Sequence, residues 1–120
     1  MCRGRSRSLE GRIPAHCAAV AMTLQLREYT VKPGEMDEWI AEWRERIVPL
    51  RAKYGFRVIG AWTVDGTDQF VWVITYDGPK SWKEADADYY ASPERKAVDP
   101  DPARHLAHVQ TRLMSDVHTG

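Results

Sequence analysis

His105 and His108 are the side chains of this chain best suited to acid–base or metal chemistry. On one turn of a helix, a spacing of three would present both imidazoles to a metal ion. However, His108 begins a segment with strand periodicity, which would point the two rings differently. We therefore favour exposed or structurally bonded histidines. If the chain is a cofactor-free oxygenase, these two residues are our candidates for the catalytic base that deprotonates a phenolic substrate.

The aromatic side chains are more informative than the histidines. Five tryptophans and five tyrosines can wall a cavity for a flat organic molecule, or they can simply fill the core. Arg27 lies among apolar strand positions, where an arginine either reaches solvent or meets an anion. Arg112 shares one face of the last predicted strand with His108. Our candidate ligand-binding residues are Arg27, Tyr29, Trp62, Trp72, Tyr76 and Arg112.

Other catalytic patterns are missing from the sequence. Gly55 and Gly60 fit neither a dinucleotide-binding loop nor a P-loop, and no serine lies in a G-x-S-x-G motif. The acidic residues near the second predicted helix occur with polar and turn residues, which indicates a solvated surface. We expect no cofactor and no metal site.

Length and charge limit the classes of protein that remain. A chain of 120 residues forms one domain with a single core, and it is small enough to gain stability from an oligomer interface. Its formal net charge of zero argues against a dedicated nucleic-acid binder, which needs a basic face. No apolar run approaches the roughly 20 residues that span a bilayer. Cys2 and Cys17 both lie near the N-terminus, so they indicate neither a disulfide framework nor a metal site in the domain.

Residues 1–21 differ in composition from the rest of the chain. They carry four arginines and a single acidic residue, and glycines and Pro14 interrupt any helix. We interpret this segment as a disordered extension, with Met22 as a natural start; a transit peptide is the alternative, because such peptides are rich in arginine and poor in acids. The predicted domain covers residues 22–116, and residues 117–120 form a short tail. We expect a cytoplasmic protein.

The predicted domain contains four strands and two helices. Alternating apolar residues predict strands over 24–31, 56–64, 69–76 and 108–113. A Pro-Gly start and an apolar stripe at spacings of three and four predict the first helix, whose last turns Pro49 should loosen. Ser81 and Glu84 have capping-box spacing at the start of the second helix, which Ser92-Pro93 interrupts. Residues 99–102 read as a loop.

The order β-α-β-β-α-β predicts a ferredoxin-like α+β fold, with an antiparallel sheet and both helices on one face. Alternation in the second strand would place Phe56, Val58, Gly60 and Trp62 on one face. Apolar residues occur on both faces of the sheet, so the face opposite the helices needs a cover of its own. A second copy of the chain, related by a two-fold axis, is the simplest cover, and we predict a homodimer.

The motif Leu26-Arg27-Glu28-Tyr29, followed by Lys32-Pro33-Gly34, resembles the NIPSNAP family. Gly55-Phe56, Gly60-Ala61-Trp62 and Ser92-Pro93-Glu94 continue the resemblance, which covers about residues 24–114. The resemblance implies a homodimeric α+β barrel with a cavity between each sheet and its helices. Quinol monooxygenases that need no cofactor share the order of elements. The family has no uniform activity and no invariant catalytic motif, so the resemblance assigns no catalytic residue.

Three classes of function are compatible with these observations. The first is a homodimer with a ring-lined cavity for a small aromatic molecule, either as a binding protein or as an enzyme such as a monooxygenase. The second is an interaction or scaffold protein without catalysis, which would have a filled core and an exposed patch outside the dimer interface. The third, ranked well behind, is a haem or metal protein with an axial histidine in the cavity. Whether the chain is an enzyme stays open at this point.

Overall fold

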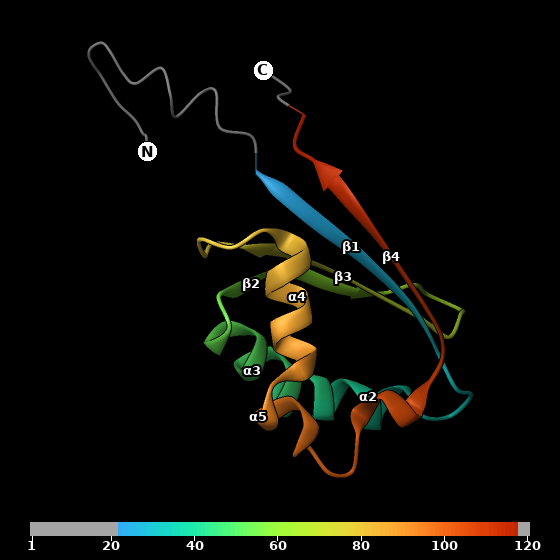
Figure 1. The fold of residues 1–120 in the computed structure, drawn as a ribbon. Helices are drawn as coiled ribbons and strands as arrows, with labels where there is room; N and C mark the ends of the chain where they lie inside the picture. Colours follow the sequence, from blue (N-terminus) through green and yellow to red (C-terminus); the bar gives the residue numbers. More distant parts are fainter. Residues whose placement is uncertain (1–21, 118–120) are drawn as a thin grey trace.

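The computed structural model describes residues 22–117, so the predicted extension at residues 1–21 and most of the C-terminal tail lie outside the described residues. A four-stranded antiparallel sheet forms one layer, and helices cover one of its faces (Figure 1). The strands are β1 (Thr23–Val31), β2 (Phe56–Thr63), β3 (Gln69–Tyr76) and β4 (Leu106–Ser115). Their order across the sheet is β2-β3-β1-β4, which confirms the predicted ferredoxin-like α+β arrangement.

The first helical segment follows the apolar stripe and is interrupted near Pro49. It consists of α2 (Met36–Glu42), a π-helical turn (Trp43–Ile47) and α3 (Val48–Lys53). A proline has no backbone N–H to donate to the preceding turn, so a wider turn just before it is a low-cost solution. The interruption keeps Trp39, Trp43 and Ile47 buried on the side of the sheet. The predicted irregularity occurs, but it lies in the turn before Pro49, and the last turns of the helix are regular.

The second helical segment begins with the predicted capping box. In α4 (Trp82–Ala91), the Ser81 hydroxyl accepts a hydrogen bond from the Glu84 backbone N–H, and the Glu84 carboxylate accepts one from the Ser81 backbone N–H. Ser92 then ends α4 and caps the short helix α5 (Pro93–Lys96). A 3₁₀ turn at Pro102–His105 begins at the end of the predicted loop and leads directly into β4. The Asp101 carboxylate caps this turn by accepting a hydrogen bond from the Ala103 backbone N–H.

The structure corrects the predicted face of Trp62. Val58 pairs with Ile74, and Gly60 pairs with Val73, so one extra residue is inserted in β2 between them. Such a bulge moves every later side chain of the strand to the opposite face. Trp62 consequently lies opposite Val71 on the face without helices, and 53% of its surface is exposed. The alternation predicted for β1 and β3 is confirmed by the burial of Tyr29 and Val31 and of Phe70, Trp72 and Ile74.

The core fills the space between the sheet and the helices, and rings dominate it. Trp72 makes edge-to-face contacts with Tyr29 and Trp43, at centroid distances of 6.1 and 5.5 Å. Such edge-to-face pairs are favoured by the quadrupoles of the rings. Polar side chains are buried with this core, and they define the candidate site.

Candidate ligand-binding site between the sheet and the helices

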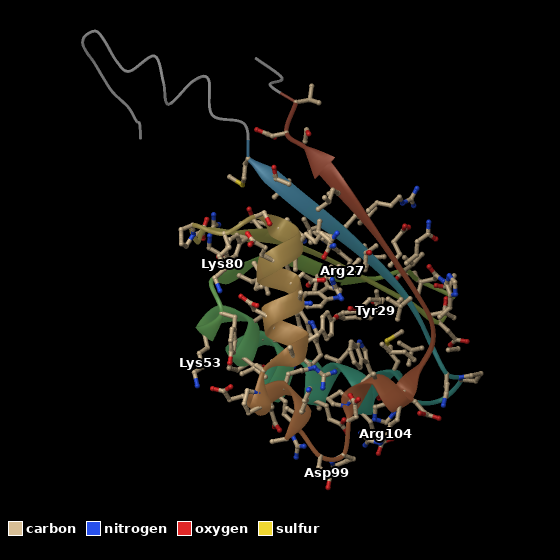
Figure 2. The ribbon with its side chains drawn as sticks, in the orientation of Figure 1. Arg27, Tyr29, Lys53, Lys80, Asp99 and Arg104 are labelled. Carbon is tan, nitrogen blue, oxygen red and sulfur yellow. The ribbon has the colours of Figure 1, made fainter. Side chains whose placement is uncertain are left out.

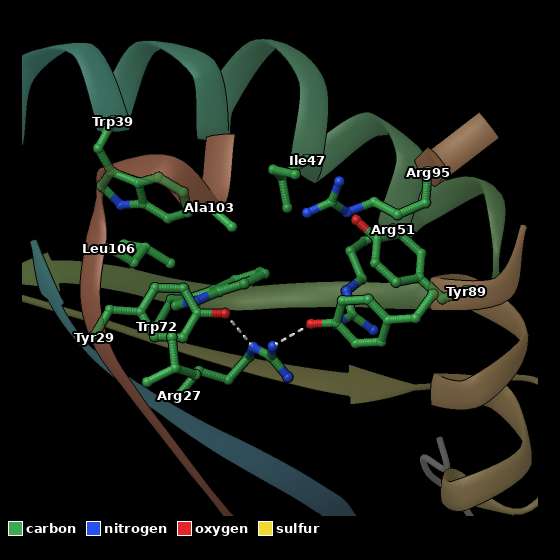
Figure 3. Close-up of a pocket in the computed structure, with 12 residues that line it drawn as sticks. Arg27, Tyr29, Trp39, Ile47, Arg51, Trp72, Tyr89, Arg95, Ala103 and Leu106 are labelled. Carbon is green, nitrogen blue, oxygen red and sulfur yellow. Dashed lines mark hydrogen bonds between the residues drawn. The ribbon is translucent and has the colours of Figure 1, made fainter. Parts of the chain in front are cut away.

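A cavity of about 100 Å³ lies between the inner face of the sheet and the helices (Figure 3). Strand β1 contributes Arg27 and Tyr29 from alternate positions, and β3 contributes Trp72, the register partner of Arg27. The apolar part of the wall consists of Ile47, Ala103, Leu106 and Val109. Strand periodicity therefore places a charged residue and two rings side by side at the floor of one cavity.

Arg27 is the centre of this floor and only 3% of its surface is exposed. Its Nε donates a hydrogen bond to the Tyr29 hydroxyl at 2.8 Å, and its two terminal nitrogens donate to Gln25 Oε1 at 2.5 Å and to the Tyr90 hydroxyl at 2.7 Å. The guanidinium also lies 5.3 Å from the centre of the Trp72 ring. These partners are all neutral, and within residues 22–117 no carboxylate forms an ion pair with Arg27.

The helices supply two further arginines to the cavity. Arg51 of α3 is 1% exposed, and it donates to Asp86 at 2.9 Å and to the Tyr90 hydroxyl at 3.2 Å. Its guanidinium lies 3.9 Å from the centre of the Tyr89 ring, within the range of a cation–π contact. Arg95 of α5 lines the cavity and forms an ion pair with Asp101 at 3.0 Å.

The buried tyrosines remain protonated at neutral pH. Burial raises the pKa of Tyr29, although the neighbouring Arg27 opposes the rise. Burial also raises the pKa of Tyr89, against the opposing effect of Arg51. Both phenols therefore carry an O–H that can donate a hydrogen bond. The Tyr89 hydroxyl is buried and has no hydrogen-bond partner among the described residues.

His105 belongs to a different polar cluster, between the 3₁₀ turn and α2. Its Nδ1 lies 2.7 Å from Glu35 Oε1 and its Nε2 lies 3.2 Å from Glu42 Oε2. Arg104 donates to both carboxylate oxygens of Glu42, at 2.8 and 2.7 Å. The hydrogen bond to Glu35 raises the pKa of His105, as does the bond to Glu42, while burial opposes them. The cluster fastens the start of β4 to α2.

The structure brings together only part of the predicted set of site residues. Arg27, Tyr29 and Trp72 line the cavity. Tyr76 packs against Phe56 at the end of β3, outside the cavity wall. Figure 2 shows Arg27 and Tyr29 near the middle of the molecule, beside α4 in this view, whereas Arg104 lies near its edge.

The other predicted residues lie outside the cavity. The bulge in β2 turns Trp62 to the open face, and Arg112 pairs with Glu28 on that same face. His108 is exposed and lies opposite Thr30, and both ring nitrogens of His105 contact carboxylates. The cavity wall contains no histidine from the described part of the chain.

Arg51, Arg95, Tyr89 and Tyr90 were missed as site residues. The motif resemblance and strand alternation pointed only to the sheet. A signal did exist in the helices: Arg51 continues the buried face of the first helix, four residues after Ile47. Arg51 thus occupies a position of the helix where an apolar residue is expected, as Arg27 does in β1.

The fold and this cavity define a class of small α+β proteins with a ferredoxin-like sheet. A NIPSNAP domain protein of Burkholderia xenovorans has the same fold, with a TM-score of 0.70 and 20% identity over 80% of this chain and 95% of that one. A NIPSNAP family protein of Agrobacterium tumefaciens has a TM-score of 0.72 and 18% identity, over 82% of this chain and 89% of that one. A structure described as an antibiotic biosynthesis monooxygenase has a TM-score of 0.55 and 16% identity, over 81% of this chain and 100% of that one.

Comparison of the sequence with known families identifies the family. The NIPSNAP family model matches residues 24–119, and the chain belongs to the NIPSNAP family. Among curated proteins, none matches this chain. In the part of the chain that the structure describes, no helix has the length and apolar character needed to cross a membrane.

Proposed function

We propose that this NIPSNAP family protein is a cytoplasmic homodimer that binds a small organic molecule in the cavity between its sheet and its helices. The observation that carries the proposal is the wall of the cavity, where three arginines converge among aromatic rings. Ligand sites are typically apolar cavities with a few placed polar groups. A filled structural core would not place charged groups around an internal space, because their burial costs free energy.

The open face of the sheet supports the dimer. Leu24 and Leu26 of β1 and Val71 and Val73 of β3 share this face, and Trp62 extends it at β2. The Trp62 ring folds over Gly60, where an added Cβ would come within 2.7 Å of the ring. An apolar sheet face of this kind is normally covered, and a second copy covers it symmetrically.

Two alternatives are ranked below ligand binding. An interaction or scaffold protein would bind its partner through an exposed patch outside the dimer interface, and it would give the buried arginines no role. An oxygenase reaction, suggested by the structural neighbour described as a monooxygenase, would need a base beside the substrate. Neither His105 nor His108 contributes to the cavity wall, so we place this reaction third.

Native mass spectrometry of the full chain tests the proposal directly, since it reports the number of subunits and any retained ligand together. We expect a dimer, with additional mass removed by mild denaturation and refolding. A dimer that retains no mass, and that binds none of a panel of aromatic acids and amides, would favour the scaffold alternative. A monomer at micromolar concentration would contradict the dimer.

A further inference from the structure

The polar groups around the cavity are almost entirely hydrogen-bond donors. Eight of the twelve lining residues have polar side-chain atoms, and these are guanidinium, phenol and indole groups: Arg27, Arg51, Arg95, Tyr29, Tyr89, Tyr90, Trp39 and Trp72. Guanidinium and indole N–H groups cannot accept a hydrogen bond. The oxygens of Tyr29 and Tyr90 already accept from arginines, which directs their own protons away from those arginines. A molecule that binds here must therefore supply acceptors.

Several of these donors have no acceptor in the described part of the chain. The unpaired buried atoms include Nε of Arg51, Nε of Arg95, the Tyr89 hydroxyl and the indole nitrogens of Trp39 and Trp72. Tyr89 is 1% exposed and Trp72 is 1% exposed. Buried donors are nearly always paired in folded proteins, and each unpaired one costs about 1–3 kcal/mol. Their clustering at one cavity indicates that the acceptor comes from a ligand.

The charges around the cavity do not balance. Arg51 is paired with Asp86, and Arg95 is paired with Asp101. Arg27, in contrast, contacts only neutral oxygens. The wall therefore carries three guanidinium groups but only two ion-paired carboxylates from the described chain, and Arg27 is the one without an ion pair, which matches a ligand with a single negative charge.

The geometry of Arg27 also fits a carboxylate. Its Nε and one terminal nitrogen donate to two separate phenol oxygens, those of Tyr29 and Tyr90 (Figure 3). In a bidentate arginine–carboxylate pair, the same two kinds of N–H meet the two oxygens of one carboxylate. Tyr29 is buried and fixed in the strand, whereas Tyr90 is 44% exposed at the surface of α4. Tyr90 is thus the partner that can move aside when a carboxylate enters.

We propose that the cavity binds the carboxylate group of a small organic monoanion, with Arg27 as its main partner and the phenols of Tyr29 and Tyr89 as further donors. This inference rests on the proposed function, because it names the chemical class of the ligand. A phosphate dianion is disfavoured, since only one charge is uncompensated.

The rest of the ligand extends into an adjoining open hollow. This hollow has a volume of about 610 Å³ and shares Tyr90, Arg95 and Ala103 with the cavity. The inner cavity alone, at about 100 Å³, is smaller than the roughly 150 Å³ cavity that holds a benzene ring. The carboxylate therefore occupies the inner cavity and its aromatic or aliphatic body faces the hollow.

Thermal unfolding of the full chain with two isosteric probes tests this inference. Sodium benzoate carries the carboxylate, and benzamide has the same shape without the charge. At constant ionic strength, we expect benzoate to raise Tm with the logarithm of its concentration above Kd, by about 5 °C at ten times its Kd. Benzamide and sodium phosphate should change Tm by less than about 1 °C under the same conditions.

Variants then locate the effect. Arg27→Met should abolish the benzoate shift, and Arg27→Lys, which keeps the charge but loses the planar fork, should reduce it by at least half. Arg57→Met is the matched control, because Arg57 is exposed and pairs with Asp77 at the surface, and it should keep the full shift.

Each other outcome has a distinct meaning. Equal shifts with benzoate and benzamide would overturn the carboxylate inference and leave the small-molecule function standing. A shift with phosphate alone would replace the carboxylate by an inorganic anion and likewise overturn it. No shift with any probe would overturn the carboxylate inference, while the retained mass in native mass spectrometry decides the proposed function separately. A benzoate shift that survives in Arg27→Met would overturn the role of Arg27.

Discussion

The two faces of the sheet carry similar apolar residues but differ in their charge and their cover. Trp72, on the inner face, is 1% exposed and contacts both the ring core and Arg27, while Trp62, on the open face, is 53% exposed. The inner face combines rings with a buried positive charge that lacks a carboxylate partner in residues 22–117. The open face is apolar, and its charged pair Glu28–Arg112 is balanced. This difference supports the proposed ligand binding on the inner face and the proposed dimer on the open face.

The largest expected effect comes from truncating the tryptophan of each face. Trp72→Ala should lower the free energy of unfolding by about 3–5 kcal/mol, because it removes a buried ring from a packed core. Trp62→Ala should lower it by less than about 1 kcal/mol per subunit, since the ring is largely exposed in the single chain. Urea denaturation, extrapolated to low protein concentration, measures both. Equal losses in the two variants would show that the faces do not differ as described.

A charge on the open face should separate association from folding. We expect Trp62→Glu to weaken the proposed dimer at least tenfold, because association would then bury an unpaired carboxylate. Analytical ultracentrifugation over a concentration series measures the change in Kd. Ala87→Glu, on the exposed side of α4, introduces the same charge away from the sheet and should leave Kd unchanged. If both variants dissociate alike, the interface lies elsewhere.

The sequence predicted the order of elements, the sheet faces of β1 and β3, the capping box at Ser81 and the weakness of the helix at Pro49. Each of these depends on local chemistry or on strict periodicity. It did not predict the face of Trp62, because a bulge is decided by pairing with β3 rather than by β2 itself. It named the sheet half of the cavity but not Arg51, Arg95 or Tyr89. Helical spacing marks Arg51 as part of a buried face, but the convergence of these residues on one cavity depends on the packing of three helical segments, which no local pattern encodes.

His105 should make a smaller, pH-dependent contribution to the free energy of unfolding, because it connects the start of β4 to the helix layer. The Glu35 and Glu42 contacts raise its pKa in the folded state above the ordinary value near 6.5. The stabilisation is therefore fully present below about pH 6.5 and is lost as the pH rises through the folded pKa. We expect His105→Gln to lower the free energy of unfolding by about 1 kcal/mol at pH 6, because water partly screens Glu35, and by less at pH 9.

Denaturation of the wild type and His105→Gln at both pH values checks this expectation, and Glu35→Gln should reproduce the loss of pH dependence. A difference between wild type and variant that is constant from pH 6 to pH 9 would mean that His105 acts only through packing.

A near-neutral change in stability is the most informative result for the inner face. Without ligand, Arg27→Met should alter the free energy of unfolding by only about 1 kcal/mol in either direction, because relief of a buried charge offsets the lost hydrogen bonds to Gln25, Tyr29 and Tyr90. Removal of a structural arginine that is paired with a buried acid would lower the free energy of unfolding much more, because it would leave the acid buried without a partner. Near-neutral stability, together with loss of benzoate binding, is the signature of a residue kept for its ligand. Urea denaturation of the ligand-free variant supplies the measurement, and a loss above about 3 kcal/mol would instead show that Arg27 holds the fold together.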